Sequence, residues 1–244
     1  MKQGIFEIVK NEALTDCVYR MVLQGDTSAI TAPGQFVNIK LDGLYLRRPI
    51  SVCNVEGDQL TIIYKVVGKG TAQMAAMKSG KLDLLTGLGN GYDLSLSGDK
   101  PVLLGGGVGV PPMYMLCKKL LEQGKAVQVI LGFNTKDEVF CEQDFAALGC
   151  TVRVTTADGS YGTRGFVTDA MGDLDYTHVF TCGPEPMLKA VYKTSTTSGQ
   201  MSFEERMGCG FGACMGCSCK TLTGYKRICK DGPVMKKEEI LWEN

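Results

Sequence analysis

Five cysteines gather towards the carboxyl end of the chain, at positions 209, 214, 217, 219 and 229. The first three ligand candidates, Cys209, Cys214 and Cys217, have the spacing x4 and then x2, which is that of plant-type [2Fe-2S] sites. The glycines between them let backbone N–H groups approach the sulfurs. We predict Cys209, Cys214, Cys217 and Cys229 as metal ligands and Cys219 as a non-ligand. Structural zinc and a metal-free cysteine-rich loop are the alternatives.

A glycine run follows the short apolar segment 101–104 and precedes Pro111, where a helix is expected to start. Glycines at such a turn let a pyrophosphate approach the backbone, and the helix N-terminus adds N–H donors and partial positive charge. The run does not fit G-x-G-x-x-G, because position 110 is Val. A tight turn without a ligand is the alternative. The candidate residues are Gly105, Gly106, Gly107 and Gly109.

The segment Cys182-Gly183-Pro184 ends a predicted strand at 178–182. Ligands of open α/β sheets lie outside the carboxyl ends of strands, so this turn is expected beside the glycine run. A thiol there could abut a nicotinamide ring, which makes Cys182 the candidate catalytic residue; a buried small hydrophobe is the alternative. His178 is the single histidine, and we interpret it as a strand-start residue.

Basic and small residues in the first part of the chain form a fourth group of candidates. An arginine can hold a phosphate with two hydrogen bonds, and Gly70-Thr71 lies at the start of a predicted helix, which is a second anion site. A basic strand edge and a helix cap are the alternatives. The residues are Arg48, Pro49, Ile50 and Ser51, with Lys65, Gly70 and Thr71 downstream.

The elements that must position these residues change in type along the chain. Short strands separated by turn signals predict a small antiparallel barrel or sandwich at residues 1–98, with one helix at 71–78. Strands that alternate with helices predict a mostly parallel α/β domain at 99–200. Residues 201–244 lose periodicity and hold too few apolar residues for a core, so a metal cluster is expected to organise them. The strands of the first part are expected at 5–10, 17–24, 35–41, 45–52 and 60–67; those of the second at 101–104, 126–133, 150–156 and 178–182; helical stretches are expected from 111 and at 137–148, 165–171 and 184–194.

Composition excludes several classes of protein. Lys plus Arg and Asp plus Glu both number 26 in 244 residues, so the chain has no electrostatic footprint for nucleic acid. Charged residues interrupt the first 30 positions, and we expect no signal peptide; the longest uncharged stretch, 17 residues, is short for a membrane span. Eleven cysteines without an export signal point to a reducing compartment, and we expect a cytoplasmic protein.

The order of these motifs is specific. R-P-x-S, G-x-G-T, GGGxGxxP, CGPxxM and the cysteine cluster follow one another in a way that resembles the ferredoxin-reductase-like flavoprotein family. Within it, the strings at 46–51, 203–220 and 225–234 are similar to the electron-transfer subunits of type B, NAD-dependent dihydroorotate dehydrogenases. The resemblance covers essentially the whole chain.

The resemblance implies an oxidoreductase subunit of pyrimidine synthesis. Electrons from a separate FMN-containing subunit that oxidises dihydroorotate would pass through [2Fe-2S] and FAD to NAD, in a heterotetramer of two plus two subunits. For FAD, the resemblance assigns phosphate and ribityl contacts to Arg48, Pro49, Ile50 and Ser51, the surroundings of the flavin ring to Ile63, Tyr64 and Lys65, and the pyrophosphate to Gly70 and Thr71. For NAD, it assigns the glycine run with Cys182, Gly183 and Pro184. The cluster is assigned to the four predicted cysteines.

Two features depart from the wider family. Many members end in an aromatic residue that stacks on the flavin, whereas this chain continues into the cysteine segment. No acidic residue lies about 20 positions after the glycine run to select NAD over NADP, so Asp137 and Glu138 are the candidates, with a solvated helix start as the alternative. A reductase subunit serving ferredoxin or sulfur compounds and a zinc-stabilised nucleotide-binding scaffold remain the competing functions.

Overall fold

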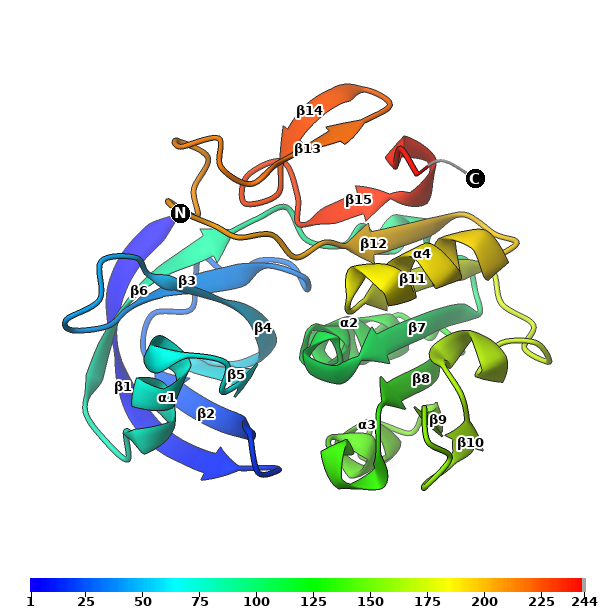
Figure 1. Ribbon diagram of the computed structural model, residues 1–244, viewed down its shortest axis with the longest axis horizontal. Coiled ribbons are helices and arrows are strands. Elements are labelled where there is room, and N and C mark those ends of the chain that lie inside the picture. The colour runs from blue at the N-terminus through cyan, green and yellow to red at the C-terminus, as the bar shows by residue number, and fades with distance from the viewer. Residues whose placement is uncertain (243–244) are drawn as a thin grey trace.

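The computed structural model describes residues 1–242 and arranges them in three parts (Figure 1). A barrel lies on the left of the view, a sheet with helices lies on the right, and the cysteine segment crosses the top of both. The last two residues of the predicted cluster segment, 243 and 244, lie outside the described residues.

The first part is a closed antiparallel barrel of six strands in the order β1-β2-β5-β4-β3-β6. Alternate side chains of each strand fill the barrel, and the largest buried ones include Phe6, Met21 and Tyr64. The barrel elements are β1 Lys2–Ala13, β2 Val18–Gln24, β3 Phe36–Lys40, β4 Arg48–Glu56, β5 Gln59–Lys65, α1 Lys69–Ala76 and β6 Lys81–Leu88.

The second part is a sheet in the order β10-β9-β8-β7-β11-β12-β15, parallel except for its last strand. The chain leaves β7 towards β8 on one side and later returns to its other side as β11, so the switch point lies between β7 and β11. Its elements are β7 Pro101–Gly106, α2 Pro111–Glu122, β8 Gln128–Phe133, α3 Glu142–Ala147, β9 Thr151–Thr156, β10 Thr163–Arg164, β11 His178–Cys182, α4 Glu185–Thr194 and β12 Gly199–Ser202.

Helix α2 joins the two parts. It packs against β4 of the barrel and against β7 and β11 of the sheet (Figure 1). Met115 on this helix belongs to the barrel core, whereas Leu116 and Leu120 pack with the sheet residues. The barrel and the sheet therefore share apolar packing and form one body.

The third part contains the hairpin of β13 Ser218–Thr221 and β14 Gly224–Arg227, and then β15 Val234–Lys236. β15 pairs antiparallel with β12 and extends the sheet. Ile228, Cys229 and Met235 are buried with sheet residues such as Val179 and Met201. The expectation that something other than burial organises this segment needs correction, because its apolar residues are buried in a core that they share with the sheet.

Most sequence predictions of elements agree with the structure, with four differences. The sixth barrel strand, β6, was not expected, although its residues alternate between buried and exposed positions. The strands β10, β12, β13, β14 and β15 were not expected either, since they have two to four residues each. The helical stretch predicted at 165–171 is a short 3-10 turn at Val167–Ala170. The stretch predicted at 137–148 is not one helix but a 3-10 turn at Lys136–Glu138 followed by α3, because Cys141 between them has a left-handed backbone with φ of 63°. His178 begins β11, as predicted.

Candidate functional site

The cysteine segment wraps around its own sulfur atoms. Cys209 Sγ accepts N–H bonds from Ala213 at 3.2 Å and from Cys214 at 3.4 Å, and Cys214 Sγ lies 3.5 Å from the Cys209 nitrogen. Partial burial raises the pKa of the Cys209 thiol, but backbone N–H groups outweigh it and lower the pKa to about 6. Thiolate is the form that binds metal, so this environment suits a ligand.

The four predicted ligands lie as two pairs. In the outer pair, Cys209 is half-buried and Cys214 is exposed. Cys217 and Cys229, the inner pair, are 2% and 1% exposed, and the Cys229 N–H donates to Cys217 Sγ at 3.4 Å. Within residues 1–242 no three potential ligands meet around a single metal position. A [2Fe-2S] cluster takes two thiolates at each iron, so two pairs of thiols are the arrangement that it requires.

Backbone conformation supports this loop at two glycines. Gly210 and Gly212 have φ values of 76° and 93°, which side chains other than glycine rarely adopt. Arg227 connects this loop to the segment after β14, because its Nη1 donates to the Gly212 carbonyl at 2.9 Å while its guanidinium also forms an ion pair with Asp231. Cys219 lies on β13 and lines a separate small hollow with Trp242. This placement is consistent with a non-ligand role.

The glycine run lies at the switch point, directly beside the turn after β11. A Cβ on Gly109 would collide with the Cys182 carbonyl, and one on Gly106 with the Met187 sulfur. A Cβ on Gly105 would lie 2.8 Å from Val110. These three glycines therefore serve the close approach of two protein segments. A Cβ on Gly107 would meet no atom within 4 Å, and its φ is 53°.

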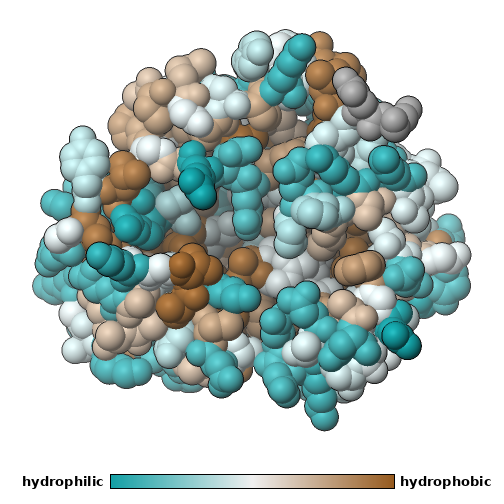
Figure 2. Space-filling model, viewed as in Figure 1, coloured by the Kyte–Doolittle hydropathy of each residue, from teal (hydrophilic) through white to brown (hydrophobic). Residues whose placement is uncertain are grey.

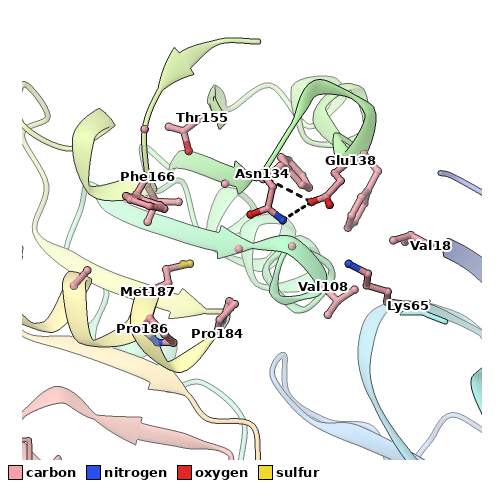
Figure 3. A pocket seen from close by; sticks show the side chains of 18 of the residues that line it. Val18, Lys65, Val108, Asn134, Glu138, Thr155, Phe166, Pro184, Pro186 and Met187 are labelled. Carbon is pink, nitrogen blue, oxygen red and sulfur yellow. Dashed lines mark hydrogen bonds between the residues drawn. The ribbon is translucent and has the colours of Figure 1, made fainter. Parts of the chain in front are cut away.

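A cavity of about 460 Å³ opens between the barrel and the sheet (Figure 3). Figure 2 shows pale and brown side chains in the hollow between the two halves, with teal ones around it. Lys65 faces the cavity from β5, opposite the glycine run (Figure 3). The other lining residues include Thr15, Val18, Gly106, Gly107, Val108, Asn134, Glu138, Thr155, Phe166, Pro184, Met187 and Glu204.

Two polar groups on the sheet side of this cavity are notable. Glu138 accepts hydrogen bonds from the Asn134 backbone at 3.4 Å and from its side-chain amide at 2.8 Å. Glu138 lines the cavity, and Asp137 is not among the lining residues described. Thr155 is fully buried, and its hydroxyl has no hydrogen-bond partner within residues 1–242 (Figure 3). An unpartnered buried hydroxyl on a cavity wall fits a polar ligand there.

Cys182 lies at the end of β11 and is 2% exposed, within the core shared by α2 and the sheet. Burial raises the pKa of its thiol to about 12, so the group is neutral in ordinary solution. The cavity wall continues through Pro184, two residues later. The Cys182 side chain therefore lies behind the residues that line the cavity and is not one of the lining residues described. Its catalytic role stays a prediction.

The barrel candidates gather where β4, β5 and the start of α1 meet. Arg48 lies across Gly70, because a Cβ at position 70 would collide with the guanidinium. This arrangement of a cation over a bare helix start suits a phosphate. Thr71 uses its hydroxyl locally, accepting from the Val67 and Gly68 nitrogens at 2.9 and 3.2 Å.

The side chains predicted around the flavin ring point in different directions. Ile63 is buried against the sheet side and Lys65 faces the cavity. Tyr64 is 2% exposed inside the barrel, where its hydroxyl bonds with Asn11 Oδ1 at 3.1 Å. Only backbone atoms of Tyr64 are therefore available outside the barrel. Pro49, Ile50 and Ser51 are partly exposed on β4.

Sequence reasoning missed several residues that the fold brings to these sites. Asn134, Thr155 and Glu204 line the cavity, and Asn38 contacts the cysteine segment. Asn134 and Thr155 follow or end strands of the parallel sheet, which is a signal that could have found them. Asn38 lies in the middle of a strand, and nothing in the sequence marks it.

Comparisons with known proteins agree with this geometry. Residues 204–241 match the model of the iron–sulfur cluster binding domain of dihydroorotate dehydrogenase B, and residues 103–193 match the oxidoreductase NAD-binding domain. The dihydroorotate dehydrogenase B (NAD(+)) electron transfer subunit of Bacillus pumilus is 43% identical over 98% of both chains. That of Fusobacterium nucleatum is 44% identical over 96% of both. The chain belongs to this family.

Solved structures share the fold. A structure described as an NADH-dependent reduced ferredoxin-NADP oxidoreductase matches with a TM-score of 0.88 and 29% identity, over 97% of this chain and 90% of that one. A ferredoxin NADP+ reductase from Neisseria gonorrhoeae with bound FAD and NADP matches with a TM-score of 0.70 and 19% identity, over 80% and 90%. The latter likeness concerns the fold alone.

These findings confirm the predicted family and the flavin-reductase fold, with a barrel, a parallel sheet and a cluster-binding segment. They also confirm an oxidoreductase subunit with an iron–sulfur cluster, a flavin and NAD as its cofactors. As an electron transfer subunit, it works with a catalytic partner. None of the helices found in residues 1–242 has the length and apolar character needed to cross a membrane.

Proposed function

We propose that this chain conducts electrons between a separate FMN-containing subunit, which oxidises dihydroorotate to orotate, and NAD. A [2Fe-2S] cluster supplies one-electron steps, and FAD links these to two-electron hydride exchange with nicotinamide. Residues 201–244 would serve the cluster, residues 1–98 FAD and residues 99–200 NAD. The family resemblance and the motif order support this division.

The observation that carries the proposal is the way the cysteine segment contacts both other parts. Its Cys209 carbonyl accepts a hydrogen bond from Asn38 of the barrel, and its β15 pairs with β12 of the sheet. An electron relay needs its three sites in one rigid body, because each transfer depends on the separation of donor and acceptor. These contacts supply that rigidity.

Each proposed site has a distinct task for its residues. The paired cysteines hold the cluster and keep water from its inner half, since Cys217 and Cys229 are buried. Arg48 neutralises phosphate charge at the start of α1. The open space at Gly107 lets a pyrophosphate lie against the backbone. The full set proposed for FAD is Arg48, Pro49, Ile50, Ser51, Ile63, Tyr64, Lys65, Gly70 and Thr71, and that for NAD is Gly105, Gly106, Gly107, Gly109, Cys182, Gly183 and Pro184.

An anaerobic visible spectrum tests the relay. The chain is co-expressed with the FMN subunit, and spectra are recorded before and after adding dihydroorotate and, in a second sample, NADH. Bleaching of both the flavin and the iron–sulfur bands by dihydroorotate is the expected result. Bleaching by NADH alone would mean that the cofactors are right and the partner is wrong. A colourless protein would contradict the whole proposal.

A second function is favoured by one observation. The structure with a TM-score of 0.88 is described as a ferredoxin-NADP oxidoreductase, so a subunit that serves ferredoxin or a sulfur compound is the alternative. Its identity to this chain is 29%, against 43% for the dihydroorotate dehydrogenase B subunits. Dihydroorotate that leaves all cofactors oxidised, with rapid electron exchange with ferredoxin, would favour the alternative.

We further propose a heterotetramer of two copies of each subunit, located in the cytoplasm. The absence of net charge and the many free cysteines support a protein that docks closely in a reducing compartment. Light scattering of the purified complex should give the mass of two plus two subunits. A chain that stays monomeric when mixed with the FMN subunit would contradict this assembly.

The proposed catalytic role of Cys182 is to favour hydride transfer at the nicotinamide; because Cys182 is 2% exposed and lies behind the cavity wall, it would act by setting the position of the turn that continues to Pro184. Cys182→Ala should slow flavin reduction by NADH by about tenfold or more, since one misplaced group at the reacting centre has effects of that size. Stopped-flow measurement of the flavin band checks this. A rate equal to that of the wild type would leave Cys182 with its packing role only.

A further inference from the structure

Asn38 lies on the outer face of the barrel, under the cysteine segment. Its neighbours in β3, Val37 and Ile39, point into the barrel core. Asn38 therefore points the other way, and it is nevertheless 1% exposed because the cysteine segment covers it. Its side-chain Nδ2 donates to the Cys209 carbonyl at 3.1 Å. A barrel strand thus holds a ligand of the predicted cluster directly.

The contact leaves little room for other residues. A Cβ on Gly210 would collide with the Asn38 amide, so the glycine is needed both for its φ of 76° and for this approach. The Asn38 Oδ1 atom is buried and has no hydrogen-bond partner among the residues described. An unpartnered buried oxygen disfavours folding, and an apolar side chain would avoid that penalty. The amide nevertheless supplies a donor to the Cys209 carbonyl, which an apolar side chain could not do.

The other side of Asn38 is the strand predicted to hold FAD. Asn38 pairs with Pro49 of β4, and its carbonyl accepts a bond from Arg47 Nη1 at 3.3 Å. Arg47 is itself held by Asp83 at 2.9 Å. One residue therefore connects the loop of the outer cysteine pair with the strand that carries Arg48 and Pro49.

We propose that Asn38 is a positioning residue that fixes the outer cysteine pair relative to the FAD-binding strand and so sets the rate of electron transfer between the cluster and the flavin. This inference rests on the proposed function. One electron moves in each event and no bond forms or breaks, so the separation of donor and acceptor and its fluctuation decide the rate. Two such events transfer the electron pair that is exchanged with NAD as a hydride.

The test compares variants of the whole chain co-expressed with the FMN subunit. Asn38→Leu keeps the four heavy atoms of the side chain and its branch at Cγ, is somewhat bulkier, and removes the donor to Cys209. Asn54→Leu is the matched control, because Asn54 is also a barrel asparagine with a buried, unpartnered Oδ1, but its amide donates to Glu56 on its own strand, at 3.2 Å. If Asn38→Leu does not accumulate, Asn38→Asp, which has nearly the same shape, takes its place.

Four measurements are made on each variant. Iron and FAD contents and the electron paramagnetic resonance of the reduced protein report whether both groups are present. Amide hydrogen exchange reports the mobility of residues 207–214. Anaerobic stopped flow with NADH separates flavin reduction from the later reduction of the cluster.

In Asn38→Leu, the iron and FAD contents are expected to equal those of the wild type, and the amide hydrogens of residues 207–214 are expected to exchange faster. Flavin reduction, the first phase, should be unchanged, whereas cluster reduction, the second phase, should be slower by about tenfold or more. The control should match the wild type in all four. Asn38→Gln, which keeps an amide donor, should lose less of the second phase than the leucine variant.

Three outcomes would overturn the role of Asn38 alone. The first is a second phase of Asn38→Leu within about twofold of the wild type, which is below 1 kcal/mol in barrier height, and the second is equal slowing in the Asn54→Leu control. The third is loss of the cluster itself in Asn38→Leu and in Asn38→Gln, which would mean that Asn38 serves assembly only. A wild-type cluster that NADH leaves oxidised would instead overturn the proposed relay, and the role of Asn38 with it.

Discussion

In the cysteine segment the predicted ligands lie on loops between short strands, whereas the cavity residues follow the ends of long parallel strands. The loop keeps its shape through N–H···S bonds, two positive-φ glycines and the Arg227 bridge. The cavity keeps its shape through the sheet and through glycines that let β7 and β11 turns touch. A site on loops depends on its bound group, while a site on a sheet exists before its ligand arrives.

Removal of a ligand from the cluster should have the largest effect. Cys229→Ser is expected to abolish iron binding and to destabilise the third part, because Cys229 is buried in the core shared with the sheet. Cys214→Ser, in the exposed outer pair, should also lose iron but leave more of the fold intact. Iron analysis and thermal melting check this.

Cys219→Ser is the control for these variants, since Cys219 faces a different hollow. It should keep its iron and its visible spectrum. Loss of iron in Cys219→Ser, or its retention in Cys229→Ser, would contradict the assignment of the two pairs.

Substitution within the glycine run should have the next largest effect and should separate packing from binding. Gly109→Ala would place a methyl group against the Cys182 carbonyl, and overpacking of this kind costs about 1–3 kcal/mol. Gly107→Ala meets no atom and should lose about 1 kcal/mol for its positive φ. The free energy of unfolding and the Kd for NADH are measured for both.

The two variants should differ in whether they lose more folding stability or more affinity for NADH. Gly109→Ala should lose stability first, whereas Gly107→Ala should weaken NADH binding more than it weakens the fold. The reverse pattern would mean that the cavity at Gly107 is not where the dinucleotide lies.

Removal of a buried hydroxyl inside the barrel should have a smaller effect on the free energy of unfolding. Tyr64→Phe removes the hydrogen bond to Asn11 and should cost about 1 kcal/mol while leaving FAD content unchanged, because the hydroxyl points away from the proposed flavin site. Tyr19→Phe, whose ring stacks on Tyr64 at a centroid distance of 6.0 Å, is the control. Loss of FAD from Tyr64→Phe would contradict the orientation described.

The last effect depends on pH and is absent under ordinary conditions. The Cys182 thiol has a pKa raised by burial from 9.0 to about 12, so the folded state keeps a proton that the unfolded chain releases. Its contribution to the free energy of unfolding is complete below pH 9 and is lost as pH rises towards about 12. Cys182→Ala should therefore flatten the decline by about 1 kcal/mol over the first pH unit. Urea midpoints measured on both proteins across this range check it, and parallel declines would contradict it.

The sequence allowed the barrel, the parallel sheet and the cysteine segment to be predicted, because glycine, proline and cysteine report local backbone demands directly. It did not allow the β12–β15 pairing to be predicted, since these strands are too short to show a period. It assigned Tyr64 to the surroundings of the flavin ring, which stays a prediction, without showing that strand alternation puts the Tyr64 side chain inside the barrel with Ile62. Asn38 could not be found, because a single polar residue in a strand has no spacing to reveal its partner.

The antiparallel pairing of β15 has a bearing on solubility. β15 is the last strand of its sheet, and without it the edge of β12 would present unpaired N–H and C=O groups to other molecules. The segment that would hold iron therefore also shields a strand edge. Cells short of iron should accumulate this protein as aggregates rather than as an inactive but soluble chain.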